Sequence, residues 1–142
     1  MIVITGASGL VGANLVRALL DESPPPGGRR LRAVIHRDAR ALQRLELEQV
    51  QADLNDPGAL AGAFAGAEIV YHLAASITLS MGGWEGLSET NVEGTRRVLA
   101  ACRQCGVRRV VYFSSIHTRQ QAPLDQALDE ERPLLDDPAA PP

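Results

Sequence analysis

Short apolar runs recur along the chain at intervals that fit the strands of a covered sheet. Runs such as IVIT and VVYF are apolar at nearly every position, which is typical of strands buried on both faces. The pattern predicts strands at residues 1–5, 31–36, 49–53, 68–73 and 108–114.

Segments with apolar residues at helical spacing lie between these strands. The spacing predicts helices over 11–21 and 39–46, a third that opens at Pro57, and a long one from 85 to 105 that ends at Gly106. Strands that alternate with crossover helices predict an α/β fold, a doubly wound parallel sheet with helices on both faces.

Composition and charge exclude several classes of partner. Every one of the 14 basic residues is arginine, the formal net charge is −3, and no basic stripe is present, so we expect no nucleic-acid partner. No apolar run approaches the roughly 18–20 residues of a membrane span, and no basic segment precedes the first apolar run as in a signal peptide. We therefore expect a cytoplasmic protein with no membrane partner.

The end of the chain differs from the rest. After His117 the sequence is rich in acidic residues and proline and shows little periodicity. This composition predicts a folded domain over 1–118 and an acidic, proline-rich loop or tail over 119–142.

Cys102 and Cys105 lie three residues apart on the long predicted helix. A lone pair at this spacing is compatible with redox chemistry, but no second pair or histidine cluster accompanies it, so no metal site is expected. We interpret both cysteines as small residues that pack on the helix.

The strongest chemical signal is the glycine-rich stretch TGASGLVG (5–12), placed between the first predicted strand and helix. A pyrophosphate must approach backbone N–H groups closely at a helix N-terminus, where the helix dipole favours anions. A side chain at Gly6 or Gly9 would obstruct that approach, and Gly12 lets the helix pack on the sheet. The residues expected to hold the phosphates are Gly6, Ser8, Gly9, Leu10, Val11 and Gly12. The alternative is a glycine-rich turn that binds no ligand.

The sequence resembles the extended short-chain dehydrogenase/reductase family, in its NAD-dependent epimerase/dehydratase and dihydroflavonol-reductase-like branch. The matching stretches, in the family's order, are TGASGLVG (5–12), ADLNDP (52–57), VYHLAA (70–75), NVEGTRRVLAAC (91–102) and GVRRVVYFSS (106–115). The resemblance implies a Rossmann-type NAD(P)-binding domain. It also implies an oxidoreductase or epimerase that transfers hydride at a carbonyl or secondary alcohol of a small-molecule substrate, whose identity stays open.

The residues after the second predicted strand bear on the choice between NADP and NAD. Arg37 can offer a planar fork to a 2′-phosphate, which favours NADP. Asp38 can instead bind the ribose hydroxyls and favour NAD, and Arg37 can also simply begin a solvated helix. Of these alternatives NADP is favoured over NAD.

The resemblance implies further cofactor contacts at the ends of later strands. Asp53 would bind the adenine amino group and Leu54 would pack on the ring, although a carboxylate here can also cap the next helix. His72, inside a strand, fits a core histidine better than a catalytic one. Small or apolar residues that would border the cofactor at the end of the fourth strand are Leu73, Ala74 and Ala75.

The resemblance also implies catalytic positions. Ser114 would face the nicotinamide, Ser115 would bind the substrate oxygen, and Asn91 would support a catalytic water and a helix bend, unless it is an ordinary polar helix residue.

The family's proton donor belongs to a Tyr-x-x-x-Lys motif, but this sequence contains no lysine, and Tyr71 and Tyr112 lie in predicted strands. We therefore expect the motif and the C-terminal substrate region to be absent from this chain, which would then be inactive alone. The alternatives are a non-catalytic dinucleotide-binding or sensing module and an interaction domain with a vestigial site. The oligomeric state is open, with a homodimer among the options.

Overall fold

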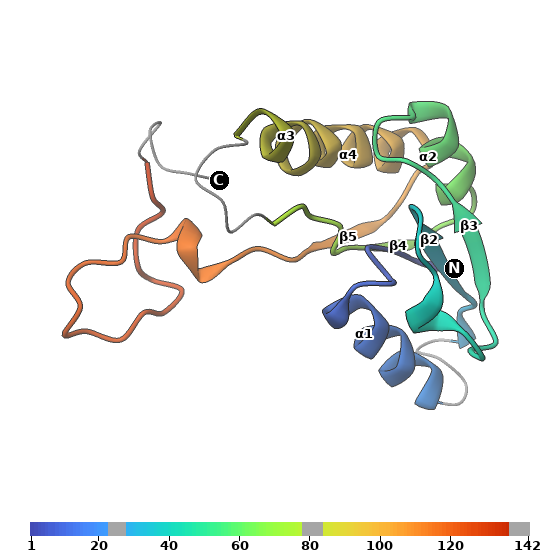
Figure 1. Ribbon diagram of the computed structural model, residues 1–142, viewed down its shortest axis with the longest axis horizontal. Helices are drawn as coiled ribbons and strands as arrows, with labels where there is room; N and C mark the ends of the chain where they lie inside the picture. The colour runs from blue at the N-terminus through green and yellow to red at the C-terminus, as the bar shows by residue number, and fades with distance from the viewer. Residues whose placement is uncertain (23–27, 78–83, 137–142) are drawn as a thin grey trace.

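The computed structural model describes residues 1–22, 28–77 and 84–136 (Figure 1). In them one parallel sheet has the strand order β3-β2-β1-β4-β5. The strands are β1 (Ile2–Thr5), β2 (Leu31–Ile35), β3 (Glu48–Gln51), β4 (Ile69–His72) and β5 (Arg109–Tyr112). The chain therefore moves outward from β1 in one direction and then returns to add β4 on its other side. This reversal creates a crevice at the carboxyl ends of β1 and β4, and it confirms the doubly wound sheet.

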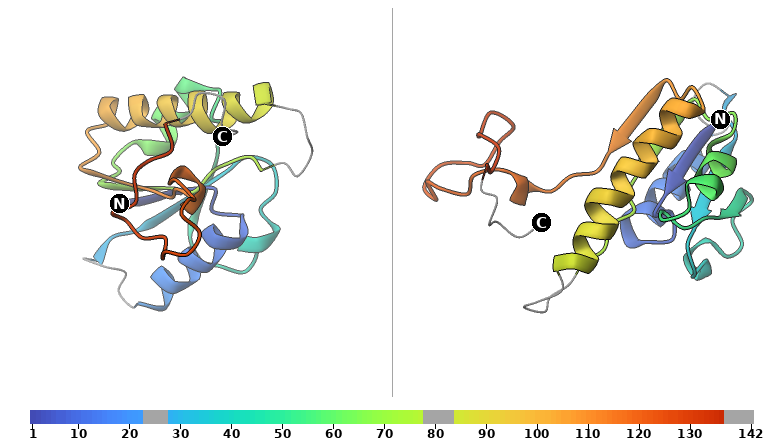
Figure 2. Two further views of the ribbon diagram at one scale, coloured as in Figure 1. Left: turned by 90° about the vertical axis from the view of Figure 1, so that its left-hand side faces the viewer. Right: turned by 90° about the horizontal axis from the view of Figure 1, so that it is seen from above.

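Helices cover both faces of the sheet. Helix α1 (Leu10–Asp21) lies on one face, and α2 (Pro57–Phe64) and α4 (Gly94–Gln104) lie on the other (Figures 1 and 2). Side chains of β1 alternate between these layers, with Ile2 and Ile4 in the α1 core and Val3 in the core beneath α2 and α4. No helix in the described ranges is both long and apolar enough to cross a bilayer.

The prediction of a helix over 39–46 was wrong. This segment contains only a short 3₁₀ turn, η2 (Arg40–Leu42), and Arg44 adopts a positive φ of 69° that ends any helical course. Leu42 is the one fully buried side chain of that turn, so packing holds a single turn against the sheet rather than a longer amphipathic face.

The long helix predicted over 85–105 forms in three consecutive parts. They are α3 (Trp84–Ser88), a π-helical turn η3 (Glu89–Glu93), and α4. A π turn inserts one extra residue per turn and often marks a functional position. Asn91 lies in the middle of η3, and Gly106 stops the helix in the left-handed conformation, as expected.

The segment after β5 leaves the sheet and passes through the short turn η4 (Ile116–Thr118) into a loop (Figure 2). An isolated antiparallel bridge between Arg119 and Leu134 closes this loop. Inside it Arg132 is 9% exposed, and its guanidinium donates to the backbone carbonyls of Gln120, Pro123, Gln126 and Ala127. One buried arginine therefore organises the acidic, proline-rich segment as far as it is described.

Two helical glycines offer a matched test of the turn that joins β1 to α1. A Cβ at Gly12 would lie 2.1 Å from the carbonyl oxygen of Gly6, whereas a Cβ at Gly62 in α2 would meet nothing within 4 Å. We expect Gly12→Ala to lower the free energy of unfolding by about 2–4 kcal/mol, because backbone must move apart. Gly62→Ala should raise it by about 0.5–1 kcal/mol through helix propensity. Urea denaturation measures both, and equal effects would contradict the close approach.

Candidate dinucleotide-binding site

The turn from β1 into α1 leaves backbone exposed at a helix N-terminus. Gly6 has φ +67°, and a Cβ there would lie 2.5 Å from the amide nitrogen of Ala74. Gly9 occupies the N-cap of α1 without a capping side chain, and the first turn of the helix carries no acidic residue. The N-terminal N–H groups of a twelve-residue helix therefore face the crevice without a competing carboxylate, which suits an anion.

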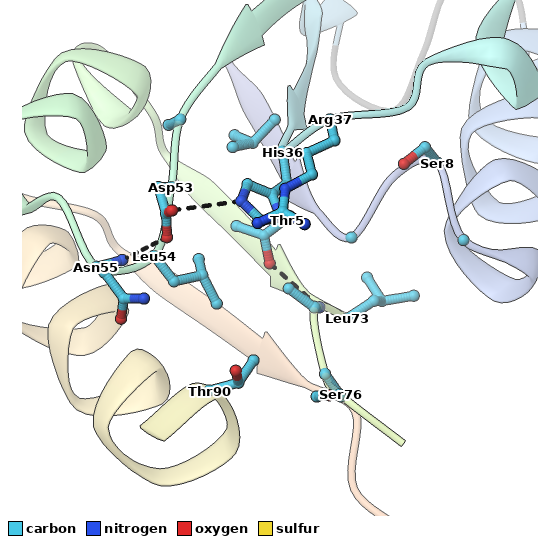
Figure 3. Close-up of a pocket in the computed structure, with 16 residues that line it drawn as sticks. Thr5, Ser8, His36, Arg37, Asp53, Leu54, Asn55, Leu73, Ser76 and Thr90 are labelled. Carbon is cyan, nitrogen blue, oxygen red and sulfur yellow. Dashed lines mark hydrogen bonds and ion pairs between the residues drawn. The ribbon is translucent and has the colours of Figure 1, made fainter. Parts of the chain in front are cut away.

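A pocket of about 510 Å³ lies beside this turn, at the carboxyl ends of the strands (Figure 3). Its size is ordinary for a small-molecule site. The predicted residues that line it are Gly6, Ser8, Gly9, Arg37, Asp53, Leu54, Leu73, Ala74 and Ala75. Residues that sequence reasoning did not select but that also line it are Thr5, Val34, His36, Ala52, Asn55, Ser76 and Thr90. Most of these adjoin a selected residue, so the rule that ligands bind where parallel strands end would have found them.

Asp53 is held as a carboxylate at one end of the pocket. One of its oxygens accepts the backbone N–H of Asn55 at 2.9 Å, and the other lies 3.3 Å from Nε2 of His36 (Figure 3). The Asn55 hydrogen bond, together with His36 and Arg37 nearby, lowers the pKa of Asp53. The alternative role of Asp53 as a helix cap is wrong, because Asp56 caps α2 by accepting the N–H of Ala59.

Asp38 is committed to a neighbour rather than to the pocket. Its carboxylate accepts the Arg40 backbone N–H at 2.9 Å and the Arg40 guanidinium at 2.6 Å. These bonds lower the pKa of Asp38. Arg37 lines the pocket, while Asp38 is not among the lining residues.

Asn91 fixes the chain that follows β4. Its side-chain oxygen accepts the N–H of Ser76 at 2.8 Å, and its side-chain nitrogen donates to the Ser76 carbonyl at 3.0 Å. This two-point contact joins the π-helical turn to a wall of the pocket, since Ser76 and Thr90 both line it. Asn91 thus acts as a backbone clamp in this structure.

His72 is a core histidine, as its place within a strand indicated. It is 1% exposed, Nδ1 lies 2.7 Å from Oγ1 of Thr5, and Nε2 lies 3.0 Å from Oγ1 of Thr95. Burial lowers the pKa of His72 to about 4, so the imidazole is neutral near pH 7.

Several predicted site residues do not line the pocket. Among them Leu10 and Val11 face solvent, and Gly12 is buried in the turn. Ser114 and Ser115 are exposed beyond β5, where the Ser115 hydroxyl accepts the N–H of His117 and caps η4. The contacts predicted for these residues, and the substrate role of Ser115, stay predictions.

Cys102 lies on the buried side of α4, and Cys105 is the C-cap residue of that helix. Cys102 is buried, and burial together with Cys105 raises the pKa of its thiol to about 11, so it is a poor nucleophile. The Cys105 thiol lies 3.5 Å from the carbonyl of Ala61 in α2. These contacts agree with a packing role, and no group of three metal-ligating side chains gathers within the described ranges.

Comparison with known proteins places this site in a family. The model of the NAD dependent epimerase/dehydratase family matches residues 2–141, so the chain belongs to that family. The chain is 43% identical over 114 residues to sterol demethylase protein B of Methylococcus capsulatus. It is 40% identical over 115 residues to a putative dihydroflavonol 4-reductase of Synechocystis. These matches cover 79% and 80% of the chain but 33% and 32% of the relatives, so it spans about a third of their length.

A solved structure with about a third of its aligned residues identical to this chain supports the fold. A short-chain dehydrogenase/reductase superfamily protein from Agrobacterium tumefaciens, determined with bound NAD, is 33% identical and superposes with a TM-score of 0.75. The match covers 96% of this chain and 39% of that one. The Rossmann-type domain and its family are therefore established.

The buried imidazole predicts a specific dependence of stability on pH. In the unfolded chain His72 takes up a proton near pH 6.5, but in the folded chain only near pH 4. Unfolding should therefore become easier as pH falls from 6.5 to 4, by roughly 3 kcal/mol in total, and this contribution stops growing below pH 4.

Urea denaturation at a series of pH values measures this effect, with His72→Gln as the matched variant. The variant cannot titrate in this range and should show a flatter profile. Asp38, Asp53 and Glu68 have lowered pKa values, so the stability they contribute is lost as pH falls from the ordinary carboxyl values toward their lower folded-state values, and it is lost equally in both proteins. Identical profiles for both proteins between pH 6.5 and 4 would contradict a neutral, buried His72.

Proposed function

We propose that the chain is the NAD(P)-binding portion of an oxidoreductase or epimerase that acts on a carbonyl or secondary alcohol. The observation that carries this proposal is the close backbone contact between Gly6 and Ala74 beside the uncapped N-terminus of α1. A Cβ at Gly6 would collide with the backbone of Leu73 and Ala74, so only glycine lets the turn pass this close to β4 and leave its backbone N–H groups for two linked phosphates. The residues present fit a dinucleotide.

Different walls of the pocket would hold different parts of the nucleotide. The N–H groups at the start of α1 would bind the phosphates, and the Asp53 carboxylate would accept the adenine amino group while Leu54 packs on the ring. The nicotinamide half of the nucleotide would be bordered by the backbone and the small or apolar side chains that follow β4, at Leu73, Ala74 and Ala75. Bound there, the nicotinamide would supply or accept a hydride.

Ser115 would bind the substrate oxygen, and Asn91 keeps the wall at Ser76 in place.

The charges at the end of β2 favour NADP over NAD. Asp38, the group that would bind the ribose hydroxyls of NAD, is engaged by Arg40 through its backbone and guanidinium. Arg37 lines the pocket, and its planar fork suits a 2′-phosphate.

Cofactor titration of two arginine variants tests the proposal. We expect Arg37→Glu to weaken NADPH binding by about tenfold or more, because a cation is replaced by an anion at the phosphate, and to change NADH binding far less. Fluorescence titration of the purified chain with each nucleotide gives the dissociation constants.

Arg40→Ala is the matched control, because it removes an arginine three residues away. It releases Asp38 and should shift preference toward NADH. Equal loss of both nucleotides in Arg37→Glu would refute the 2′-phosphate role. The lack of saturable binding of either nucleotide to the parent chain would refute the dinucleotide site.

The residue content of the chain favours a second candidate, a non-catalytic module that binds or senses a dinucleotide. The sequence has no lysine, and Tyr71 and Tyr112 are both in strands, β4 and β5. No residue pair of this chain can therefore form the tyrosine–lysine proton donor that hydride transfer to a carbonyl needs.

We accordingly predict that the 142-residue chain alone reduces no carbonyl substrate while it binds NADPH. Oxidation of NADPH, followed by absorbance with sugar-nucleotide, flavonoid-like and steroid-like ketones, should not exceed the rate without protein. Turnover by the purified chain that Ser115→Ala abolishes would overturn this prediction and would locate a complete active site in these residues.

A further inference from the structure

A series of polar side chains crosses the apolar interior directly behind the pocket. Apart from Arg132 in the loop, Thr5 and His72 are the buried polar side chains among the described residues. His72 joins Thr5 on β1 to Thr95 on α4, at 2.7 Å and 3.0 Å. The Thr95 hydroxyl in turn donates to the carbonyl of Asn91 at 2.6 Å.

The donors and acceptors in this series fix the direction of every hydrogen bond. A hydroxyl has one proton, and that of Thr95 is used on the Asn91 carbonyl, so Thr95 Oγ1 must accept from His72. Burial keeps His72 neutral, with a pKa of about 4, so its single ring proton lies on Nε2. Nδ1 is then an acceptor, and the Thr5 hydroxyl donates to it.

Both ends of this series reach the walls of the pocket. The N–H of Ala74 lies 3.4 Å from Thr5 Oγ1, which can still accept because its own proton points to His72. Ala74 is the residue whose backbone packs on Gly6. At the other end, Asn91 holds Ser76 by two hydrogen bonds. The segment from Ala74 to Ser76 is thus anchored from both ends, although His72 itself is not among the lining residues.

We propose that His72, as the Nε2-protonated tautomer, is a positioning residue for the dinucleotide site. Through Thr5 it sets the backbone of Ala74 against the glycine turn, and through Thr95 it sets the π-helical turn that places Asn91 on Ser76. The role rests on the proposed function, because a correctly placed wall matters for affinity only if a nucleotide binds there.

An apolar core would need none of these hydrogen bonds, because a side chain of similar shape would fill the same volume. A polar series in a buried site instead specifies one arrangement, since each group left without its partner costs free energy. The series therefore fixes the positions of β1, β4 and the start of α4 relative to one another, in addition to filling space.

Substitutions can break the series at one bond without touching the pocket. Thr95→Val keeps the shape of the side chain and removes the hydroxyl, while Thr95→Ser keeps the hydroxyl. We expect Thr95→Val to weaken NADPH binding roughly three- to tenfold and Thr95→Ser to restore most of that loss. His72→Asn, which retains an acceptor near Nδ1 but nothing near Nε2, should resemble Thr95→Val.

Two further readouts separate positioning from a purely structural role. Nitrogen NMR of the ring should show Nε2 protonated and Nδ1 bare at pH 7 in the parent chain. In Thr95→Val the amide signals of Ala74 and Ser76 should shift and exchange faster, while the far-ultraviolet circular dichroism stays that of the parent.

Results that contradict the role of His72 differ from the result that contradicts the proposed function. An Nδ1-protonated ring, or a folded Thr95→Val chain with parental affinity and parental Ala74 and Ser76 amides, overturns the proposal for His72. Absence of nucleotide binding by the parent chain overturns the proposed function instead. In that case the protonation of the ring and the amide signals of Ala74 and Ser76 still test whether His72 positions the segment from Ala74 to Ser76.

Discussion

The approach of the Gly6 backbone to the backbone of Ala74 is the constraint on which the site depends. It requires a residue without a side chain in the left-handed conformation, and it brings the end of β1 against the end of β4. Gly12, in the first turn of α1, must also lack a side chain, because a Cβ there would lie 2.1 Å from the Gly6 carbonyl oxygen. Both contacts hold the N-terminus of α1 at the point where the strand order reverses, so the fold itself aims the helix dipole into the crevice.

The two ends of the sheet carry different kinds of polar contact. At the amino end the side chain of Glu68 contacts Arg29, the chain N-terminus and Arg108, and its hydrogen bonds to Arg29 and to the N-terminus lower the pKa of its carboxyl group. At the carboxyl end the pocket is bordered by backbone amides, by the contact between His36 and Asp53, and by short side chains. The pocket lies at the carboxyl end, beside the N-terminus of α1, so this is the end of the sheet that offers a ligand both volume and free backbone N–H groups.

The sequence predicted the strands well because buried parallel strands are short, apolar and bounded by turns, so every predicted strand lies within two residues of an observed one. It failed at residues 39–46, where Leu42 and Leu45 do pack on the core but the positive φ of Arg44 ends the helical course between them. The glycine turn and Asp53 could be selected from local motifs. The contact of His36 with Asp53 could not, because it joins the ends of two strands whose adjacency is set by the sheet. No sequence motif indicated that Arg132 would donate to four carbonyls that lie 5 to 12 residues before it, because that arrangement depends on how the loop folds back on itself.

The buried polar series at His72 shows why stability and site geometry are linked in this domain. Its hydrogen bonds join β1, β4 and the start of α4 to the Asn91 carbonyl in η3, and β1 and β4 lead directly into the glycine turn and the pocket wall. A charged imidazole there would require Nδ1 to become a donor, and the Thr5 hydroxyl could no longer donate to it. The neutral form that burial enforces is therefore also the form in which Nδ1 accepts the Thr5 hydroxyl proton while the Thr5 oxygen accepts from Ala74, so the desolvation of one side chain preserves the hydrogen bonds behind the pocket.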